Sequence, residues 1–218
     1  TIGIALASRV RFRELVGAGR WQEAGAILRA VPRDFPFIER YFLADQNGTL
    51  MADFPHATAA RGNNFAARDW YQGVSRNWRA YVSGVDQPSA PGRKIIAAAA
   101  PIRAEDGSPS GVLVLEVALD SLRSWIKDLD PGDHGVILVF DQKGGLASHP
   151  TLDLQGEFHD DAVAASARQA LAGGHGVETA ARTERAGVQL FAYAPVAGHG
   201  WGVVVAQPTA TAYARGDS

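Results

Sequence analysis

The sequence contains an internal repeat, and a duplicated chain is expected to fold into two copies of one module. LADQNGTLMADFP at 43–55 matches VFDQKGGLASHP at 139–150 through a shared Asp-Gln-x-Gly. Two more matches follow in the same order: an Ala-Pro pair at 100 and at 194, and a Gly-Val-x-Val run that starts at 111 and at 202. Turns between strands are often rich in Asp and Gly, which would explain one of these matches. Three matches in one order indicate a duplication.

Each copy predicts the element order strand, turn, strand, helix, strand, turn, strand. The strongest signal is Asp45-Gln46-Asn47-Gly48 between two apolar runs, because Asn-Gly favours a tight hairpin turn. The first copy has predicted strands at 38–44, 49–52, 80–85, 94–102 and 111–119 and a helix at 65–77, and the second has strands at 135–140, 145–148, 188–196 and 202–206 and a helix at 161–172. Hairpins combined with one helix per copy predict an α+β fold, in which each module is an antiparallel sheet with flanking helices.

The residues outside the two copies predict helices. Apolar residues recur every three to four positions through residues 1–30, and Pro32 ends the pattern. We therefore expect a long N-terminal helix over 1–34, and Gly17 and Gly19 leave open whether it is one kinked helix or two. A linking helix is expected over 119–132, between the two modules.

Composition excludes several classes of protein. The 218 residues include no cysteine, which excludes disulfides, zinc–thiolate sites, iron–sulfur clusters and thiol nucleophiles. The net charge of −2 argues against a nucleic-acid partner, which requires a basic face. No apolar run approaches the roughly 20 residues of a membrane span. Since the chain begins at Thr1 without methionine, we expect it to be a fragment of a longer protein.

The sequence contains no recognisable catalytic or metal-binding motif. Its six histidines are never three to five residues apart, the spacing at which a helix or turn places two metal ligands together. Ser148 and His149 are neighbours on a predicted strand and therefore point to opposite faces of the sheet. We expect no catalytic residue, no bound metal and no cofactor.

One cluster of residues suits a small anionic ligand. Arg68-Asp69-Trp70-Tyr71 places a guanidinium beside two aromatic rings. Arginine binds a carboxylate through two parallel hydrogen bonds, and aromatic rings can form the walls of a small pocket. A surface helix whose tryptophan packs into the core and whose arginine is solvated would produce the same pattern. Both interpretations remain open at this level.

Glu116 lies inside the otherwise apolar predicted strand 111–119. By strand alternation its side chain shares a face with Val112 and Val114. Burying a carboxylate in the middle of a strand without a partner costs on the order of several kcal/mol. Either this face is solvated, or Glu116 meets a cation, a donor or a ligand.

The combination of these features resembles the double Cache (dCache) extracellular sensor domains of bacterial chemoreceptors, sensor histidine kinases and diguanylate cyclases. The resemblance covers essentially the whole chain. It rests on the duplicated module, the leading helix and the motif R-x-W-Y. The supporting segments are FLADQNGTLMADFP at 42–55, RDWYQGV at 68–74, the run from AAPIR to GVL at 99–113, VFDQKGGLASHP at 139–150 and GWGVVVAQP at 200–208.

The resemblance implies a division of the chain into four parts. A leading helix at 1–34 would follow a membrane span, and a linking helix at 119–132 would join two PAS-like modules. The module at 35–118 would be distal to the membrane and would hold the ligand site. The module at 133–218 would be proximal to the membrane and would lead into a second span.

The resemblance also implies which residues bind the ligand. In amino-acid-binding members, the Arg and Trp of the motif hold the ligand carboxylate, which implies Arg68 and Trp70, with Tyr71 beside them. An acidic residue on the last distal strand, here Glu116, would hold the ligand amine. Two positions depart from the family pattern, because Glu116 is usually Asp and Asn63 is usually Tyr. The remaining candidates, on the segment before the next strand, are Tyr81, Ser83 and Asp86.

The resemblance therefore predicts a periplasmic, non-catalytic sensor domain of an inner-membrane protein. Its ligand would be a small carboxylate, an amino acid or an amine-type molecule, and binding would relay a conformational signal across the membrane. The alternative is a sensor that binds no small molecule and instead responds to a periplasmic binding protein or transmits a conformation. A homodimer through residues 1–30 is expected in the full receptor, and the isolated domain is compatible with a monomer.

Overall fold

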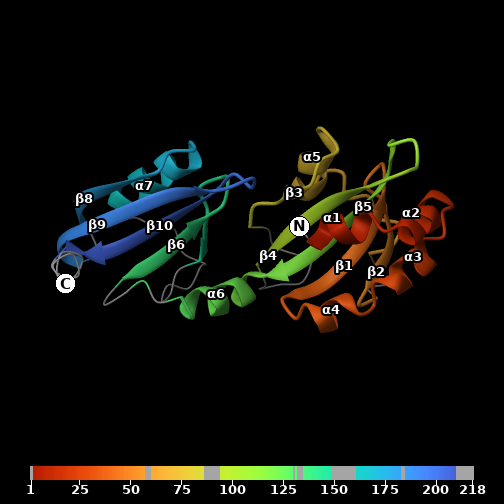
Figure 1. The fold of residues 1–218 in the computed structure, drawn as a ribbon, viewed down its shortest axis with the longest axis horizontal. Helices are drawn as coiled ribbons and strands as arrows, with labels where there is room; N and C mark the ends of the chain where they lie inside the picture. Colours follow the sequence, from red (N-terminus) through yellow and green to blue (C-terminus); the bar gives the residue numbers. More distant parts are fainter. Residues whose placement is uncertain are drawn as a thin grey trace. The chain divides into compact units, whose positions relative to one another are not determined.

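Two five-stranded antiparallel sheets form the framework of the chain in a computed structural model (Figure 1). The structure describes residues 2–56, 60–85, 94–129, 131, 135–148, 161–182 and 185–209. The chain divides into two compact units, a first unit at Thr1–Ala118 and a second at Leu119–Ser218. The predicted α+β class, with antiparallel sheets and flanking helices in two modules, is confirmed.

The first unit has its five strands in the order β2-β1-β5-β4-β3. The strands are β1 (Ile38–Asp45), β2 (Leu50–Phe54), β3 (Tyr81–Val82), β4 (Ile95–Arg103) and β5 (Pro109–Ala118). Helix α5 (Asp69–Ser75) lies between β2 and β3 in the sequence and is shorter than the predicted helix at 65–77. Strand β3 is also shorter than predicted, since only Tyr81 and Val82 pair with β4.

The second unit repeats this topology with the strand order β7-β6-β10-β9-β8. Its elements are α6 (Leu119–Lys127), β6 (Val136–Phe140), β7 (Leu146–Ser148), α7 (Asp161–Leu171), β8 (Gly176–Arg182), β9 (Arg185–Val196) and β10 (Trp201–Pro208). Strand β8 was not predicted, because four residues of the sequence GVETAAR are Gly, Ala or Glu, which are depleted in strands. The predicted linking helix corresponds to α6, which belongs to the second unit.

The two copies use the same first turn, down to its hydrogen bonds. Asp45 Oδ1 accepts from the backbone N–H groups of Asn47 and Thr49, both at 2.9 Å. Asp141 Oδ1 accepts from the N–H groups of Lys143 and Gly145, at 2.9 and 2.8 Å. The glycine of each motif, Gly48 or Gly144, has a φ of +83° or +81°, which a residue with a side chain rarely adopts. The repeated Asp-Gln-x-Gly therefore encodes one turn geometry twice.

The third match of the repeat is shifted by one residue in the structure. Pro101 of β4 pairs with Val112, whereas the equivalent Pro195 of β9 pairs with Gly202. Gly202 is therefore equivalent to Val112 and not to Gly111. The two glycines have different neighbours, because a Cβ on Gly111 would lie 3.0 Å from Trp21, and one on Gly202 would lie 3.0 Å from Ala170 of α7.

The prediction of one long N-terminal helix is wrong over the described residues. Four short helices take its place, namely α1 (Ile2–Ala7), α2 (Val10–Gly17), α3 (Trp21–Ile27) and α4 (Val31–Asp34). The helix breaks where Arg9 is extended at ψ 128° and where Gly19 has a φ of +72°. A straight 34-residue helix would be about 50 Å long, whereas a sheet of five strands is only about 24 Å wide across its strands. Breaking the helix lets its apolar residues fold back over one sheet.

The first unit has a helical layer on each face of its sheet. Helices α1 to α4 cover one face, where Phe12, Leu15 and Leu28 are almost fully buried against Leu113 and Leu115 of β5. Helix α5 covers the opposite face, where Trp70 and Val74 pack on Val112 and Val114 of β5. In the second unit, α7 packs on its sheet around Phe191 and Val204. None of the helices in the described ranges is long and apolar enough to cross a bilayer.

We expect Asp45→Ala to lower the free energy of unfolding by about 1–2 kcal/mol, since two backbone donors lose their acceptor. Asp45→Asn keeps an acceptor oxygen at the same position and should cost less than about 0.5 kcal/mol. Urea denaturation followed by tryptophan fluorescence measures both. Equal losses for the two variants would show that the charge, and not the acceptor geometry, stabilises the turn.

Stability should also depend on pH through Tyr41, whose hydroxyl donates to Gly25 O at 2.9 Å. Burial raises the pKa of Tyr41 to about 12, and Arg29 lowers it in part. Since the unfolded chain loses this proton near pH 10 and the folded chain near pH 12, the contribution is complete below pH 10 and is lost as the pH rises towards 12. The loss is on the order of 2 kcal/mol. Urea midpoints between pH 9 and pH 12 should fall more steeply for the wild type than for Tyr41→Phe, and parallel curves would contradict this assignment.

Candidate functional site

A small cavity lies under α5, on the face of the first sheet that this helix covers. Its volume is about 50 Å³. It is lined by residues from β1, β2, β4, β5, α5 and the segment before α5, which are Arg40, Phe42, Leu50, Ala60, Phe65, Arg68, Trp70, Ile95, Ala97 and Glu116. Residues far apart in the sequence therefore meet at one place on the sheet.

Aromatic rings form the apolar wall of this cavity. Trp70 is buried and stands edge-on to Phe42, with their ring centroids 5.4 Å apart. The ring of Phe65 is tilted towards that of Phe42, with the two ring centroids 6.5 Å apart. Ala97 on β4 is small, so the sheet leaves room beneath the rings. Such packing holds the walls in place independently of any ligand.

Charged groups form the polar wall. Arg40 of β1 and Glu116 of β5 stand directly opposite each other in the antiparallel ladder, and their nearest charged atoms, Nη1 and Oε2, are 4.0 Å apart. The Arg40 guanidinium also lies 5.7 Å from the centroid of Phe42, a cation–π distance. Glu116 is therefore a partly buried carboxylate that meets a cation on the neighbouring strand.

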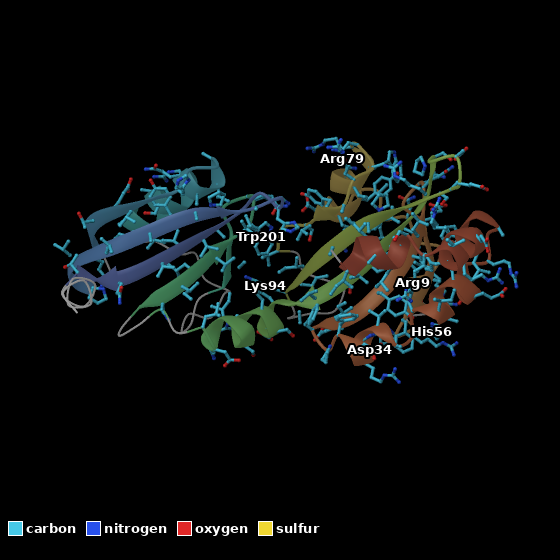
Figure 2. All side chains as sticks on the ribbon, viewed as in Figure 1. Arg9, Asp34, His56, Arg79, Lys94 and Trp201 are labelled. Atoms are coloured by element: carbon cyan, nitrogen blue, oxygen red, sulfur yellow. The ribbon has the colours of Figure 1, made fainter. Side chains whose placement is uncertain are left out.

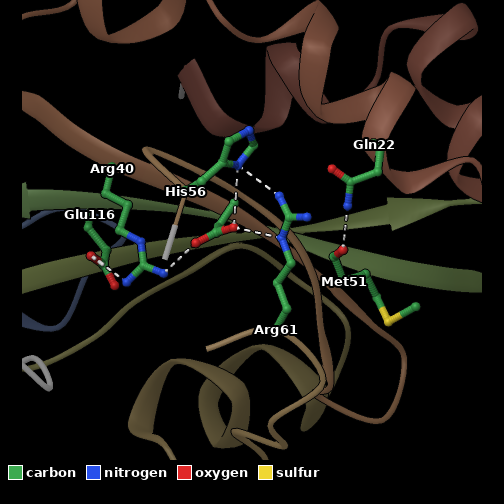
Figure 3. Close-up of polar contacts among 7 residues, drawn as sticks. Gln22, Arg40, Met51, His56, Arg61 and Glu116 are labelled. Atoms are coloured by element: carbon green, nitrogen blue, oxygen red, sulfur yellow. Dashed lines mark hydrogen bonds and ion pairs between the residues drawn. The ribbon is translucent and has the colours of Figure 1, made fainter. Parts of the chain in front are cut away.

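Asp53 links Arg40 to a second arginine, Arg61, through contacts that are drawn as dashed lines in Figure 3. Its side chain is fully buried, and its two oxygens accept from Arg40 Nη2 and Arg61 Nε, both at 3.1 Å. His56 Nδ1 lies 3.8 Å from the same carboxylate and 2.7 Å from Arg61 Nη2. The network fixes the orientation of Arg40 at the cavity wall, because one end of its guanidinium is held by Asp53.

Three of the residues predicted to bind a ligand line this cavity together: Arg68, Trp70 and Glu116. Arg68 is the residue before α5, and the helix begins at Asp69. The ladder places Glu116 at the same wall from β5. The roles of these residues towards a ligand stay predictions.

Three other predicted residues do not line the cavity. Tyr71 donates to Gln46 O at 2.8 Å and packs on Gly48 of the first turn. Tyr81 donates to Asp69 at 3.3 Å and covers Gly73 of α5. Ser83 donates to Gly84 O at 2.7 Å and accepts from Ala97 N at 2.9 Å. These side chains hold α5 and β3 on the sheet. Asp86, the seventh predicted residue, lies outside the described residues.

Arg40 and Asp53 were missed by the sequence analysis. A signal was present, because Arg40 interrupts the apolar run IERYFLA as Glu116 interrupts its own strand. Pairing the two would have required the register between β1 and β5. In the described part of the chain, no three of the residue types His, Asp, Glu and Cys are grouped as a metal site requires.

The profile of the Cache domain, in its dCache_1 form, matches residues 5–215. A search of curated protein sequences gives no match.

Solved structures with this fold include extracellular and ligand-binding domains of histidine kinases and chemoreceptors. The extracellular domain of the candidate histidine kinase mmHK1S-Z3 is 18% identical at a TM-score of 0.70, with 99% of this chain and 87% of that chain covered. The ligand-binding domain of the Pseudomonas aeruginosa amino acid chemoreceptor PctB, in complex with L-Arg, is 17% identical at a TM-score of 0.70. The match covers 97% of this chain and 88% of that chain. The ligand-binding domain of the Pseudomonas fluorescens chemoreceptor CtaA, in complex with L-isoleucine, is 17% identical at a TM-score of 0.68. The match covers 97% of this chain and 85% of that chain.

The fold is a tandem α+β domain, and it is shared with the extracellular domain of mmHK1S-Z3 and with the ligand-binding domain of PctB. The chain belongs to the Cache-domain family, as a double Cache domain with two modules of identical strand order.

We expect Asp53→Asn to lower the free energy of unfolding by about 3 kcal/mol, because it removes the charge that two part-buried arginines share. The matched control is Asp34→Asn, which breaks an exposed contact with Arg33 and should cost less than about 1 kcal/mol. Urea denaturation of both variants measures the difference. Similar losses would mean that the Asp53 network contributes no more than a surface ion pair.

Proposed function

We propose that the chain is the extracytoplasmic ligand-sensing domain of a transmembrane signal transducer of the chemoreceptor or histidine kinase type. Membership of the double Cache family supports this proposal, and the structures with the same fold are extracellular domains of such receptors. The domain would sit in the periplasm, anchored by segments of a longer protein, and would act as a homodimer in the membrane. Its role would be binding and not catalysis.

The single observation that carries the proposal is the cavity under α5, where Arg40, Arg68 and Glu116 meet aromatic rings. Two guanidiniums and one carboxylate leave a net charge of +1 at the wall, which attracts a monoanion. A carboxylate would bind Arg68 beside Trp70. We therefore propose a small carboxylate as the ligand class.

The position of Arg40 disfavours an ordinary α-amino acid. A ligand amine at Glu116 would have to lie beside the Arg40 guanidinium, which is already 4.0 Å from Glu116 and is held in place by Asp53. Two cations sharing one carboxylate repel each other, and this repulsion discriminates against the amine. PctB and CtaA were solved with amino acids, so this chain would differ from them in ligand class.

The ligand would act by shifting an equilibrium between two arrangements of the first unit. Its carboxylate would bind Arg68 next to α5, and its body would contact Phe42 and Trp70, so it would join the helix to the sheet. The state in which α5 lies closest to β1 and β5 would gain these contacts. A change in the position of α5 would then be the first step of the signal.

The test is a thermal shift assay on the 218-residue chain with acetate, propionate, pyruvate, glycine, L-alanine and glycine betaine. At about 100 times its Kd a ligand adds roughly 2.7 kcal/mol of stability, which raises the Tm of the unit by several degrees. We expect a small carboxylate to produce this shift and Arg68→Ala to abolish it. Arg76→Ala is the matched control, because Arg76 is exposed at the end of α5 and does not line the cavity.

One observation favours the alternative of a sensor without a small ligand. The cavity of about 50 Å³ is far below the roughly 300 Å³ of a typical small-molecule site. A domain whose α5 face is filled by its own side chains would transmit a conformation or respond to a binding protein. If no member of the panel shifts the Tm, the carboxylate proposal is wrong and this alternative stands. If a ligand shifts the Tm of Arg68→Ala as much as that of the wild type, the ligand binds elsewhere and the site under α5 is wrong.

A further inference from the structure

A larger cavity, of about 580 Å³, lies in the first unit away from the α5 site. Its volume is within the range of roughly 300–1,000 Å³ that is usual for small-molecule sites. Residues of α1, α2, the segment before β3 and the β4–β5 hairpin line it, namely Ile4, Ala7, Ser8, Arg13, Arg79, Ala80, Pro101, Arg103, Ala104, Glu105 and Gly107. Among the described residues, none lines both cavities.

The cavity lies beside the part of β4 that the short β3 does not reach. Strand β3 pairs with β4 only at Ala98 and Ala99, so the described ladder leaves the β4 edge from Ala100 to Arg103 without a partner on that side. Pro101 lies on this open edge and has no N–H to offer to an added strand. The edge is therefore poorly suited to strand addition, and the space beside it is walled by α1 and by the segment that carries Arg79.

Three arginines give this cavity a strong positive charge. Arg13 donates to Arg103 O at 2.6 Å and to Ala104 O at 2.8 Å. Arg103 donates to Gly107 O at 2.8 Å and to Trp78 O at 2.5 Å. These acceptors are neutral carbonyls, so they orient the guanidiniums without cancelling their charge.

The third arginine, Arg79, is exposed beside α5 (Figure 2). Within the described ranges, no carboxylate lies at ion-pair distance from Arg13, Arg79 or Arg103. Among the described residues that line the cavity, Glu105 is the one acidic residue, and these residues carry a net charge of +2.

The segment before Arg79 is held in an unusual backbone conformation. Trp78 has a φ of +51°, which is rare for a bulky residue. The hydrogen bond from Arg103 to Trp78 O ties this segment to β4, and the Trp78 ring packs against the core beneath α5. Such a conformation persists only where its surroundings hold it, and here it places Arg79 at the cavity.

We propose that this cavity is a second ligand site, for an organic anion with a short apolar body. The anionic head would bind the guanidiniums of Arg13, Arg79 and Arg103. The apolar body would lie against Ile4, Ala7 and Pro101. Because α1 and α2 form one wall and the β4–β5 hairpin the other, the ligand would join the N-terminal helices to the sheet. The domain would thus take two ligands, at sites with separate residues.

The test uses hexanoate as the probe and hexanamide as its uncharged counterpart, with binding to the 218-residue chain measured by isothermal titration calorimetry. We expect saturable binding of hexanoate that is at least about tenfold tighter than that of hexanamide, since the charge supplies the head-group contacts. Arg79→Ala should weaken hexanoate binding about tenfold. Ala80→Trp, which fills the cavity from an exposed position, should abolish it.

Two controls separate this site from others. Arg76→Ala removes the same charge three residues from Arg79, outside the cavity lining, and should change the affinity less than about twofold. Arg68→Ala disables the site under α5 and should leave hexanoate binding here intact. The absence of saturable binding, equal affinity for hexanamide, or insensitivity to both Arg79→Ala and Ala80→Trp would each overturn the proposal. If Arg68→Ala abolishes hexanoate binding while Arg79→Ala and Ala80→Trp do not, hexanoate binds in the cavity under α5, and the proposal is overturned as well.

Discussion

Strand β5 is buried on both of its faces, and this constraint organises the first unit. Val112, Leu113, Val114 and Leu115 are all nearly inaccessible, so the sheet needs an apolar layer on each side. The N-terminal segment supplies one layer and α5 with its preceding segment supplies the other. Burying these side chains is worth roughly 1.5–3 kcal/mol each, far more than the cost of interrupting a helix at one or two residues. The leading segment is therefore four short helices over its described residues.

The same two-sided burial decides where charge can lie. Arg40 and Glu116 are near the ends of the apolar stretches of β1 and β5, on the face under α5, and each would be costly to bury alone. Placing them opposite each other and tying Arg40 to Asp53 offsets this cost. The result is a wall with a defined set of charges beside packed rings.

Much of the architecture could be predicted because its signals are local. The Asp-Gln-x-Gly motif specifies one turn by two side-chain hydrogen bonds and one positive φ, so a match in sequence is a match in geometry. The apolar runs on either side of that turn identified β1, β2, β6 and β7 for the same reason. The glycine match failed because Gly111 and Gly202 each make room for a different neighbour, Trp21 or Ala170, and close packing is not a local property.

The sequence by itself determined the duplication, the antiparallel modules, the turn chemistry and three residues, Arg68, Trp70 and Glu116, that meet at one cavity. Only the tertiary structure decided that Tyr71, Tyr81 and Ser83 hold α5 and β3 in place, that Arg40 faces Glu116, and that a second cavity lies beside the part of β4 that the short β3 does not reach. The physical reason is that the period of a strand or helix tells which side chains share a face. The register between strands and the length of an edge strand, which decide what each face meets, depend on packing between segments distant in the chain.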